Sequence, residues 1–215
     1  MLPPDLTFDA APHTYRHQGI IVPSVTQILD ITGFTRAWSA ITQEDREMYF
    51  ARGHWTHRVA ELLPNGDLDR STDWFVEHAD VWAGYVGAID GFYAAGDYEP
   101  VATEVRLYHP ILRYAGSPDG LGLWHGKPCV LDFKNGVTAS LRPIQCYIEA
   151  QTAAYRLALP WLVNYPYKDR PHLRVAIELH GDGTWKPVQL IHREPEKLFL
   201  TALSLFNQFA MFDAV

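Results

Sequence analysis

The sequence predicts an α+β fold in which a central mixed β-sheet is flanked by helices and preceded by a largely helical N-terminal region. Helical periodicity dominates residues 42–95, strand alternation dominates residues 101–134, and helices surround a further hairpin near the C-terminus. No internal repeat or low-complexity linker divides the 215 residues. We therefore expect a single domain over 1–215, with 1–98 mainly helical and 99–215 forming the sheet and its flanking helices.

The first elements are predicted from turn and cap residues. A hairpin is expected over residues 13–22, around Gly19. Ser24 then caps a short helix over residues 25–31, which Gly33 ends.

The middle of the chain changes from helical to strand periodicity. Two longer helices are predicted over 42–63 and 72–95, because a Pro-Asn-Gly break at 64–66 separates them. Apolar and polar residues then alternate with the period of a β-strand. The strands predicted from this pattern cover residues 101–107, 111–114, 119–124 and 129–134.

The last third of the chain combines helices with one more hairpin. A helix is predicted over 143–159, because Pro160 cannot continue it. Residues 173–179 and 187–192 form the hairpin, and an amphipathic helix over 195–212 closes the sequence.

The composition excludes several classes of protein. Apolar residues make up 47% of the chain and charged residues only 20%, which is typical of a chain that buries a sizeable core. The net charge of −7 excludes a broadly basic nucleic-acid coat, although a local basic groove remains open. No apolar run approaches the roughly 20 residues that span a bilayer, and the N-terminus does not resemble a secretory signal. We therefore expect a cytoplasmic protein without a membrane partner.

Three polar side chains are predicted to meet in the hairpin that ends the strand-rich region. If the hairpin turns at 126–127, Asp119 lies opposite Lys134 and Asp132 lies opposite Leu121. Side chains alternate along a strand, so both aspartates and the lysine point to one face, with the aspartates roughly 7–8 Å apart. A slip of one residue would separate them, so this prediction depends on the register.

Two carboxylates and an ammonium group on one face are typical of a site for a divalent cation. Carboxylate oxygens suit Mg²⁺ or Mn²⁺, and Lys134 could orient a water molecule or stabilise phosphate charge. The alternative is a solvated hairpin in which the acids only pair with Lys134. The apolar neighbours Val130, Leu131 and Phe133 indicate a strand inside the sheet and favour the metal site.

Several motifs resemble one family of nucleases. Gly-Ser-Pro-Asp at 116–119, followed by Asp-Phe-Lys at 132–134, resembles the PD-(D/E)XK nuclease superfamily. Residues 151–155 are similar to the Gln-x-x-x-Tyr motif of its RecB-like branch, and residues 53–57 are similar to the Gly-x-x-x-His segment of that branch. Pro-Ser-Val-Thr at 23–26 resembles a stretch near the start of mitochondrial genome maintenance exonucleases and related phage exonucleases.

The resemblance implies a restriction-endonuclease-like fold and a role for each matched residue. The catalytic residues that it implies are Asp119, Asp132, Lys134, Gln151 and Tyr155. The metal ligands that it implies are His57, Asp119, Asp132 and the backbone carbonyl of Phe133, with Glu104 as a further candidate. The arginines near motif positions, which are candidate DNA contacts, are Arg52, Arg142 and Arg156.

The activity that the resemblance implies is a Mg²⁺- or Mn²⁺-dependent deoxyribonuclease, an exonuclease rather than a sequence-specific endonuclease. Its partner would be single-stranded DNA or DNA ends, in recombination, repair or processing, as in the related phage enzymes. Some relatives carry an iron–sulfur cluster, but the two cysteines, Cys129 and Cys146, cannot supply its ligands. A non-catalytic DNA-end-binding or interaction subunit and another metal-dependent hydrolase remain alternatives, and the oligomeric state stays open.

Overall fold

The fold consists of a central sheet, two smaller sheets and six helices among the residues that the structure describes. This computed structural model describes residues 5–10, 12–30, 42–136 and 142–212. The strands are β1 (Leu6–Asp9), β2 (Thr14–His17), β3 (Ile20–Val22), β4 (Tyr98–Thr103), β5 (Leu107–His109), β6 (Tyr114–Gly116), β7 (Gly120–Trp124), β8 (Lys127–Asn135), β9 (Leu173–Leu179) and β10 (Trp185–Gln189). The helices are α1 (Val25–Asp30), α2 (Gln43–Leu62), α3 (Asp73–Ala79), α4 (Ala83–Ala94), α5 (Arg142–Ala158) and α6 (Pro195–Phe212), with a 3₁₀ turn, η2 (Leu159–Trp161).

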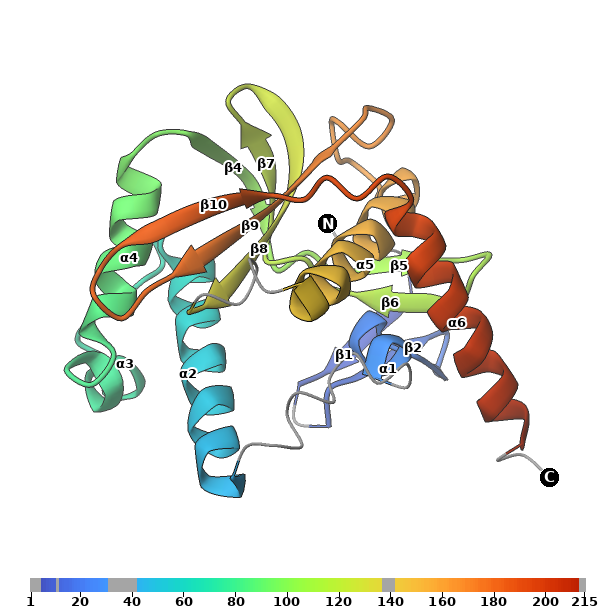
Figure 1. The fold of residues 1–215 in the computed structure, drawn as a ribbon, viewed down its shortest axis with the longest axis horizontal. Coiled ribbons are helices and arrows are strands. Elements are labelled where there is room, and N and C mark those ends of the chain that lie inside the picture. The colour runs from blue at the N-terminus through green and yellow to red at the C-terminus, as the bar shows by residue number, and fades with distance from the viewer. Residues whose placement is uncertain (1–4, 11, 31–41, 137–141, 213–215) are drawn as a thin grey trace.

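The central sheet is mixed, as predicted, and has five strands. Its order is β10-β9-β8-β7-β4 (Figure 1), and only the β8–β9 pair is parallel. Helix α5 connects these two parallel strands, because parallel neighbours need a crossover. The α+β class with a mixed, helix-flanked sheet is therefore confirmed.

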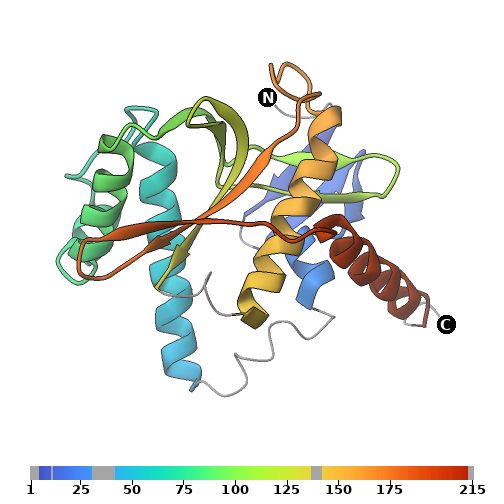
Figure 2. The same cartoon turned by 45° about the horizontal axis from the view of Figure 1, so that its top comes forward.

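Helices cover both faces of the central sheet (Figures 1 and 2). Helices α2, α3 and α4 lie on one side and α5 with α6 on the other. Strand β8 contributes side chains to the cores on both faces of the sheet. Cys129, Leu131 and Phe133 pack toward α2–α4, whereas Val130 packs toward α5 and α6. The remaining side chains of that second face, Asp132 and Lys134, therefore point toward α5.

Several predicted elements are confirmed close to their expected bounds. Helix α2 begins after Thr42, whose side chain accepts a hydrogen bond from the Asp45 amide. Helix α1 begins with a reciprocal cap in which Ser24 Oγ accepts from the Gln27 amide while Gln27 Oε1 accepts from the Ser24 amide. Helices α5 and α6 also match. The predicted end of the first helix, at residues 31–33, lies outside the described residues.

The predicted helix over 72–95 is wrong, because it is two helices. Helix α3 ends at Ala79 and α4 starts at Ala83. Between them, Trp82 turns into the core, where its ring lies 5.4 Å from that of Trp55. Burying this large ring outweighs the local preference for a continuous helix.

The strands around residues 101–114 also differ from the prediction. The expected strand over 101–107 ends at Thr103, because Glu104 adopts a left-handed conformation with φ of 46°. The segment expected as a strand over 111–114 is a turn, and β6 begins only at Tyr114. Both deviations are local backbone turns that residue periodicity does not reveal.

Two further strands differ from the prediction. Strand β10 spans Trp185–Gln189 rather than 187–192. Strand β1 was not predicted, and it completes a three-stranded sheet, β1-β2-β3, in the part expected to be mainly helical.

None of the described helices combines the length and the apolar character that a membrane crossing requires.

Candidate metal centre

The predicted site residues gather where β7 begins and β8 ends. Asp119 directly precedes β7, and Glu104 follows β4, the neighbouring strand of the sheet. His57 projects from α2, which packs on one face, while Gln151 and Tyr155 project from α5 on the other face. The sheet therefore brings together residues that are up to about a hundred positions apart in the sequence.

The hairpin register differs from the predicted one, but the predicted face is correct. The turn is His125-Gly126, with φ of 47° and 74°, so Trp124 pairs with Lys127. Continuing this register by one residue places Asp119 across from Asp132 rather than Lys134. The error is two residues, an even number, so both aspartates and the lysine still share a face.

His57, Glu104 and Asp119 form the candidate metal cluster. One ligand atom from each lies within 4.8 Å of the others. His57 Nδ1 is 3.0 Å from Asp119 Oδ1, and Asp119 Oδ2 accepts a hydrogen bond of 2.6 Å from the Phe133 amide. The second of these contacts orients the Asp119 carboxylate from the backbone of β8.

The electrostatics of the cluster are unbalanced. Burial raises the pKa of Glu104, and the charge of Asp119 raises it further, to about 8. Burial alone would lower the pKa of His57, but the Asp119 carboxylate outweighs it and raises the pKa to about 9. The same imidazolium, against burial, holds the pKa of Asp119 below its usual value. Glu104 and Asp119 thus share a single cationic neighbour, His57. A divalent cation bound between the two carboxylates would stabilise the charged form of both.

The left-handed backbone of Glu104 explains how it enters the cluster. Its amide donates a 3.3 Å hydrogen bond to the carbonyl of Asp119. This contact joins the end of β4 to the residue before β7, so the chain turns where a continued strand would have carried Glu104 past the site. A non-glycine residue at positive φ costs free energy and is common at functional sites.

Lys134 lies next to this cluster within a chain of polar contacts that leads into α5. Its Nζ is 2.6 Å from Asp132 Oδ2 and donates a 3.4 Å hydrogen bond to Gln151 Oε1. Gln151 Nε2 in turn donates to the Tyr155 hydroxyl at 3.1 Å. Burial would lower the pKa of Lys134, but Asp132 and Asp119 raise it, so the ammonium group stays charged.

The metal fit therefore differs in part from the expectation. The residues present suit a hard divalent cation, since two carboxylates and one imidazole are within bridging distance. Glu104, which was only a further candidate, belongs to the described cluster. Asp132, which was expected as a ligand, lies outside this three-residue cluster and pairs with Lys134, and burial raises its pKa despite that ammonium. Its role as a ligand stays a prediction. The Phe133 amide contacts the cluster, and the expected role of the Phe133 carbonyl as a ligand stays a prediction.

Gly116 connects three of the sequence motifs. A Cβ at this position would lie 2.7 Å from Tyr155 Cε1 and 3.0 Å from Val25 Cγ2. The glycine of the Gly-Ser-Pro-Asp turn is thus required by the tyrosine of α5 and the valine of the Pro-Ser-Val-Thr segment. Sequence motifs that looked independent meet in one packed contact.

A second positioning contact was not predicted. Asn135 Nδ2 donates a 2.9 Å hydrogen bond to Thr56 Oγ1, and Thr56 is fully buried. This bond ties α2 to the end of β8 directly beside His57 and Lys134. Only the adjacency of these two polar residues to predicted site residues could have signalled it.

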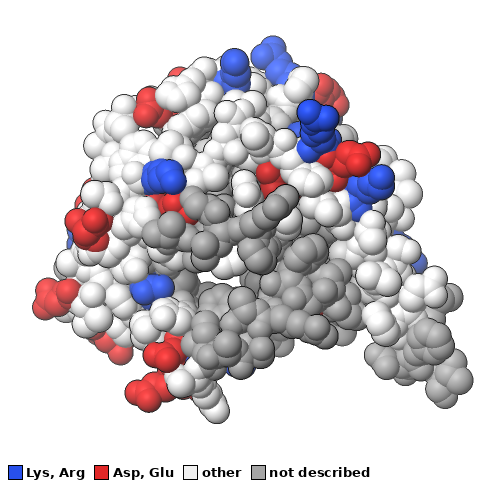
Figure 3. All heavy atoms as spheres, viewed as in Figure 1, with Lys and Arg blue, Asp and Glu red and all other residues white. Residues whose placement is uncertain are grey.

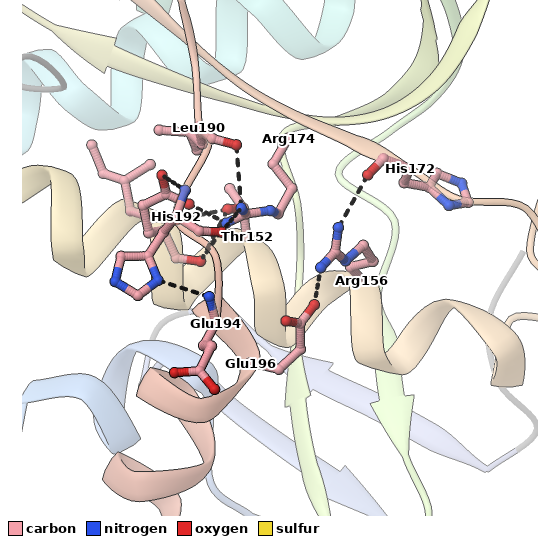
Figure 4. A network of polar contacts seen from close by, with 10 residues as sticks. Thr152, Arg156, His172, Arg174, Leu190, His192, Glu194 and Glu196 are labelled. Carbon is pink, nitrogen blue, oxygen red and sulfur yellow. Dashed lines mark hydrogen bonds and ion pairs between the residues drawn. The ribbon is translucent and has the colours of Figure 1, made fainter.

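The three candidate DNA-contacting arginines lie in different surroundings. The Arg52 guanidinium lies between two rings, 5.0 Å from the centroid of Tyr49 and 4.8 Å from that of Tyr85. Arg142 is the first residue of α5, and its side chain is outside the described part of the chain. Arg156 lies away from the cluster, where it pairs with Glu196 of α6 and donates to the His172 carbonyl (Figure 4).

The face of the molecule in Figure 3 shows no broad basic area among the residues that the structure describes. On the face in Figure 3, the described Lys and Arg side chains lie among Asp and Glu side chains, without a continuous basic area.

Neither the family models nor the curated proteins that were searched include a match to this chain. The nuclease family therefore stays a prediction from the motifs.

Proposed function

We propose that this protein is a divalent-metal-dependent deoxyribonuclease that hydrolyses DNA phosphodiester bonds, as an exonuclease with little sequence preference. The observation that carries the proposal is the joint placement of His57, Glu104 and Asp119 beside the Lys134 ammonium group. Carboxylate oxygens that can bind a metal ion, next to a partly buried ammonium group, are the groups that phosphodiester hydrolysis needs.

The bound ion, Mg²⁺ or Mn²⁺, would activate a water molecule and neutralise charge on the phosphate. His57, Glu104 and Asp119 would hold it. Lys134 would stabilise negative charge on the attacked phosphate or orient the attacking water, because it remains protonated between Asp132 and Gln151. Asp132 thus acts as a positioning residue for Lys134, and Tyr155 positions Gln151.

A DNA substrate is compatible with the net charge of −7, because a few local cations are enough to bind one strand. Nothing in the described part of the site resembles a module that reads base edges, which supports low sequence preference. Roles in recombination, repair or processing follow from the resemblance alone.

The test is degradation of end-labelled linear DNA in Mg²⁺, in Mn²⁺ and in EDTA. We expect metal-dependent release of nucleotides by the wild type and at least a thousand-fold loss in Lys134→Met. Lys127→Met is the matched control, because Lys127 is an exposed lysine at the start of the same strand. Thermal denaturation of each variant checks whether the fold is intact.

The same assay separates the alternatives. Wild-type protein that binds DNA ends without cleaving them would favour the non-catalytic subunit. Full metal-supported activity in Lys134→Met, with the fold intact, would overturn the proposed reaction.

A further inference from the structure

The N-terminal sheet is attached directly to the candidate site. The hydroxyl of Tyr15, in β2, lies 3.0 Å from Ser117 Oγ, two residues before Asp119. The amide of Ala115 also donates a 2.9 Å hydrogen bond to the Pro23 carbonyl. These contacts place β1-β2-β3 beside the Gly-Ser-Pro-Asp turn, although the resemblance gave this sheet no role.

An arginine is held on this sheet next to the metal cluster. The Arg106 guanidinium carbon lies 5.0 Å from the centroid of the Phe8 ring, and Phe8 packs on Tyr15 with centroids 4.6 Å apart. Arg106 follows Glu104 by two residues. Arg106 is thus connected through Phe8 and Tyr15 to Ser117 in the Gly-Ser-Pro-Asp turn.

Arg106 forms no ion pair with a described carboxylate, although Glu104 is only two residues away in the sequence. Arg52, five residues before His57 on α2, is likewise held by aromatic rings and forms no ion pair with a described carboxylate. Arg58, Arg70, Arg156 and Arg174 are in contrast paired with acids. Arg106 is half-buried, so its side chain is restrained yet still reachable.

This arrangement suits recognition of a phosphate. A guanidinium stacked on a ring keeps its planar N–H edge free, and that edge matches phosphate oxygens in a bidentate geometry. Restraint by Phe8 reduces the entropy lost when a ligand binds. The exposed His13 ring, 5.0 Å from that of Phe8, adds a polar aromatic group at the same place.

We propose that Arg106, held on Phe8 of the N-terminal sheet, binds a backbone phosphate of the DNA strand next to the phosphate that is cleaved. The inference rests on the proposed nuclease function and extends it to a substrate contact outside the matched motifs. The N-terminal sheet is then part of the substrate-binding surface.

The experiment measures binding of a fluorescein-labelled single-stranded oligodeoxynucleotide by anisotropy, with Ca²⁺ in place of Mg²⁺ to limit cleavage. We expect Arg106→Met to raise Kd about tenfold and to reduce the slope of log K against log salt by about one. Arg16→Met is the matched control, because Arg16 is exposed on the same sheet and alternates to the opposite face from Tyr15. It should bind within twofold of the wild type.

A second measurement does not depend on the stability of the variant. Single phosphates of the oligonucleotide are replaced, one at a time, by neutral methylphosphonates. One position should weaken binding by the wild type but not weaken binding by Arg106→Met any further. If every position weakens both proteins equally, or if Arg106→Met binds like the wild type, Arg106 does not contact a phosphate.

The outcomes separate this inference from the function on which it rests. If the wild type cleaves DNA and Arg106→Met binds DNA as tightly as the wild type, the inference is overturned and the nuclease proposal stands. Wild-type protein that neither binds nor cleaves DNA would overturn both.

Discussion

Two buried groups of charged residues in this protein differ in how completely their charges are compensated. On α5 and β9, Arg174 pairs with Glu149, and it donates to the carbonyls of Glu149 at 3.1 Å and Leu190 at 3.2 Å (Figure 4). The second Glu149 oxygen accepts from the His192 amide at 2.9 Å. Both side chains are almost fully buried, and each charge has a partner.

The metal cluster has the opposite balance. Three carboxylates, Glu104, Asp119 and Asp132, face one lysine and one histidine. Burial and the charge of Asp119 raise the pKa of Glu104 to about 8. A group of charges that are all paired joins secondary-structure elements, whereas a group with excess carboxylate needs a further cation. This difference supports the proposal that the second group is the functional one.

The largest effect is expected from removing an anion of the cluster. Asp119→Asn should lower metal-dependent DNA cleavage by at least a thousand-fold, because it removes a ligand charge and the partner of His57. In Glu104→Gln, by contrast, stability in EDTA should change by less than about 1 kcal/mol, since burial and Asp119 raise the pKa of that carboxyl and its charge is poorly compensated. Cleavage assays and urea denaturation in EDTA measure the two quantities. A large loss of stability would mean that the cluster is a structural ion-pair network.

The paired group should respond in the reverse way. Arg174→Leu leaves Glu149 buried without its cation and should destabilise the fold by about 3–5 kcal/mol, as measured by urea denaturation. The double variant Glu149→Leu/Arg174→Leu is the control and should recover much of that loss. Equal destabilisation by the single and double variants would show that packing, and not the unpaired charge, accounts for the effect.

Metal should stabilise the wild type but not a variant that lacks a ligand. At a hundred times its Kd, Mn²⁺ should raise the free energy of unfolding by about 2.7 kcal/mol. In Glu104→Gln the increase should be much smaller at the same Mn²⁺ concentration. Thermal denaturation with and without Mn²⁺ measures this, and equal stabilisation of both proteins would exclude Glu104 as a ligand.

The smallest effect concerns pH and His172, which lies at the edge of the paired group. Burial lowers the pKa of His172 below 6.5, and its Nε2 lies 3.2 Å from the Tyr165 hydroxyl. The folded state therefore favours the neutral imidazole, so its contribution is complete above pH 6.5 and is lost as pH falls below that value. Between pH 7 and pH 5, the wild type should lose up to about 1 kcal/mol more than His172→Gln. Urea denaturation at both pH values tests this, and identical losses would contradict it.

Sequence patterns were sufficient where local signals agree with packing. Ser24 caps its helix as expected, the second helix begins next to the predicted position, at Thr42, and strand alternation correctly places Asp119, Asp132 and Lys134 on one face. The face survives an error in register because alternation depends only on parity. The register itself depends on which two residues form the turn, and both adjacent pairs around Gly126 were plausible.

The features that were missed depend on contacts between distant residues. The break before Trp82 is made by packing on Trp55, and the left-handed turn at Glu104 is joined to Asp119 by a backbone hydrogen bond. Arg106 gains its surroundings only when β1 brings Phe8 beside it. No periodicity within a single segment could reveal these contacts.

The most direct measurement is an anomalous difference map from a crystal of the wild-type protein soaked with Mn²⁺. The account predicts a peak bonded to His57, Glu104 and Asp119, at ligand distances of about 2.0–2.3 Å. Saturation with Mn²⁺ and no peak at these three side chains would contradict it.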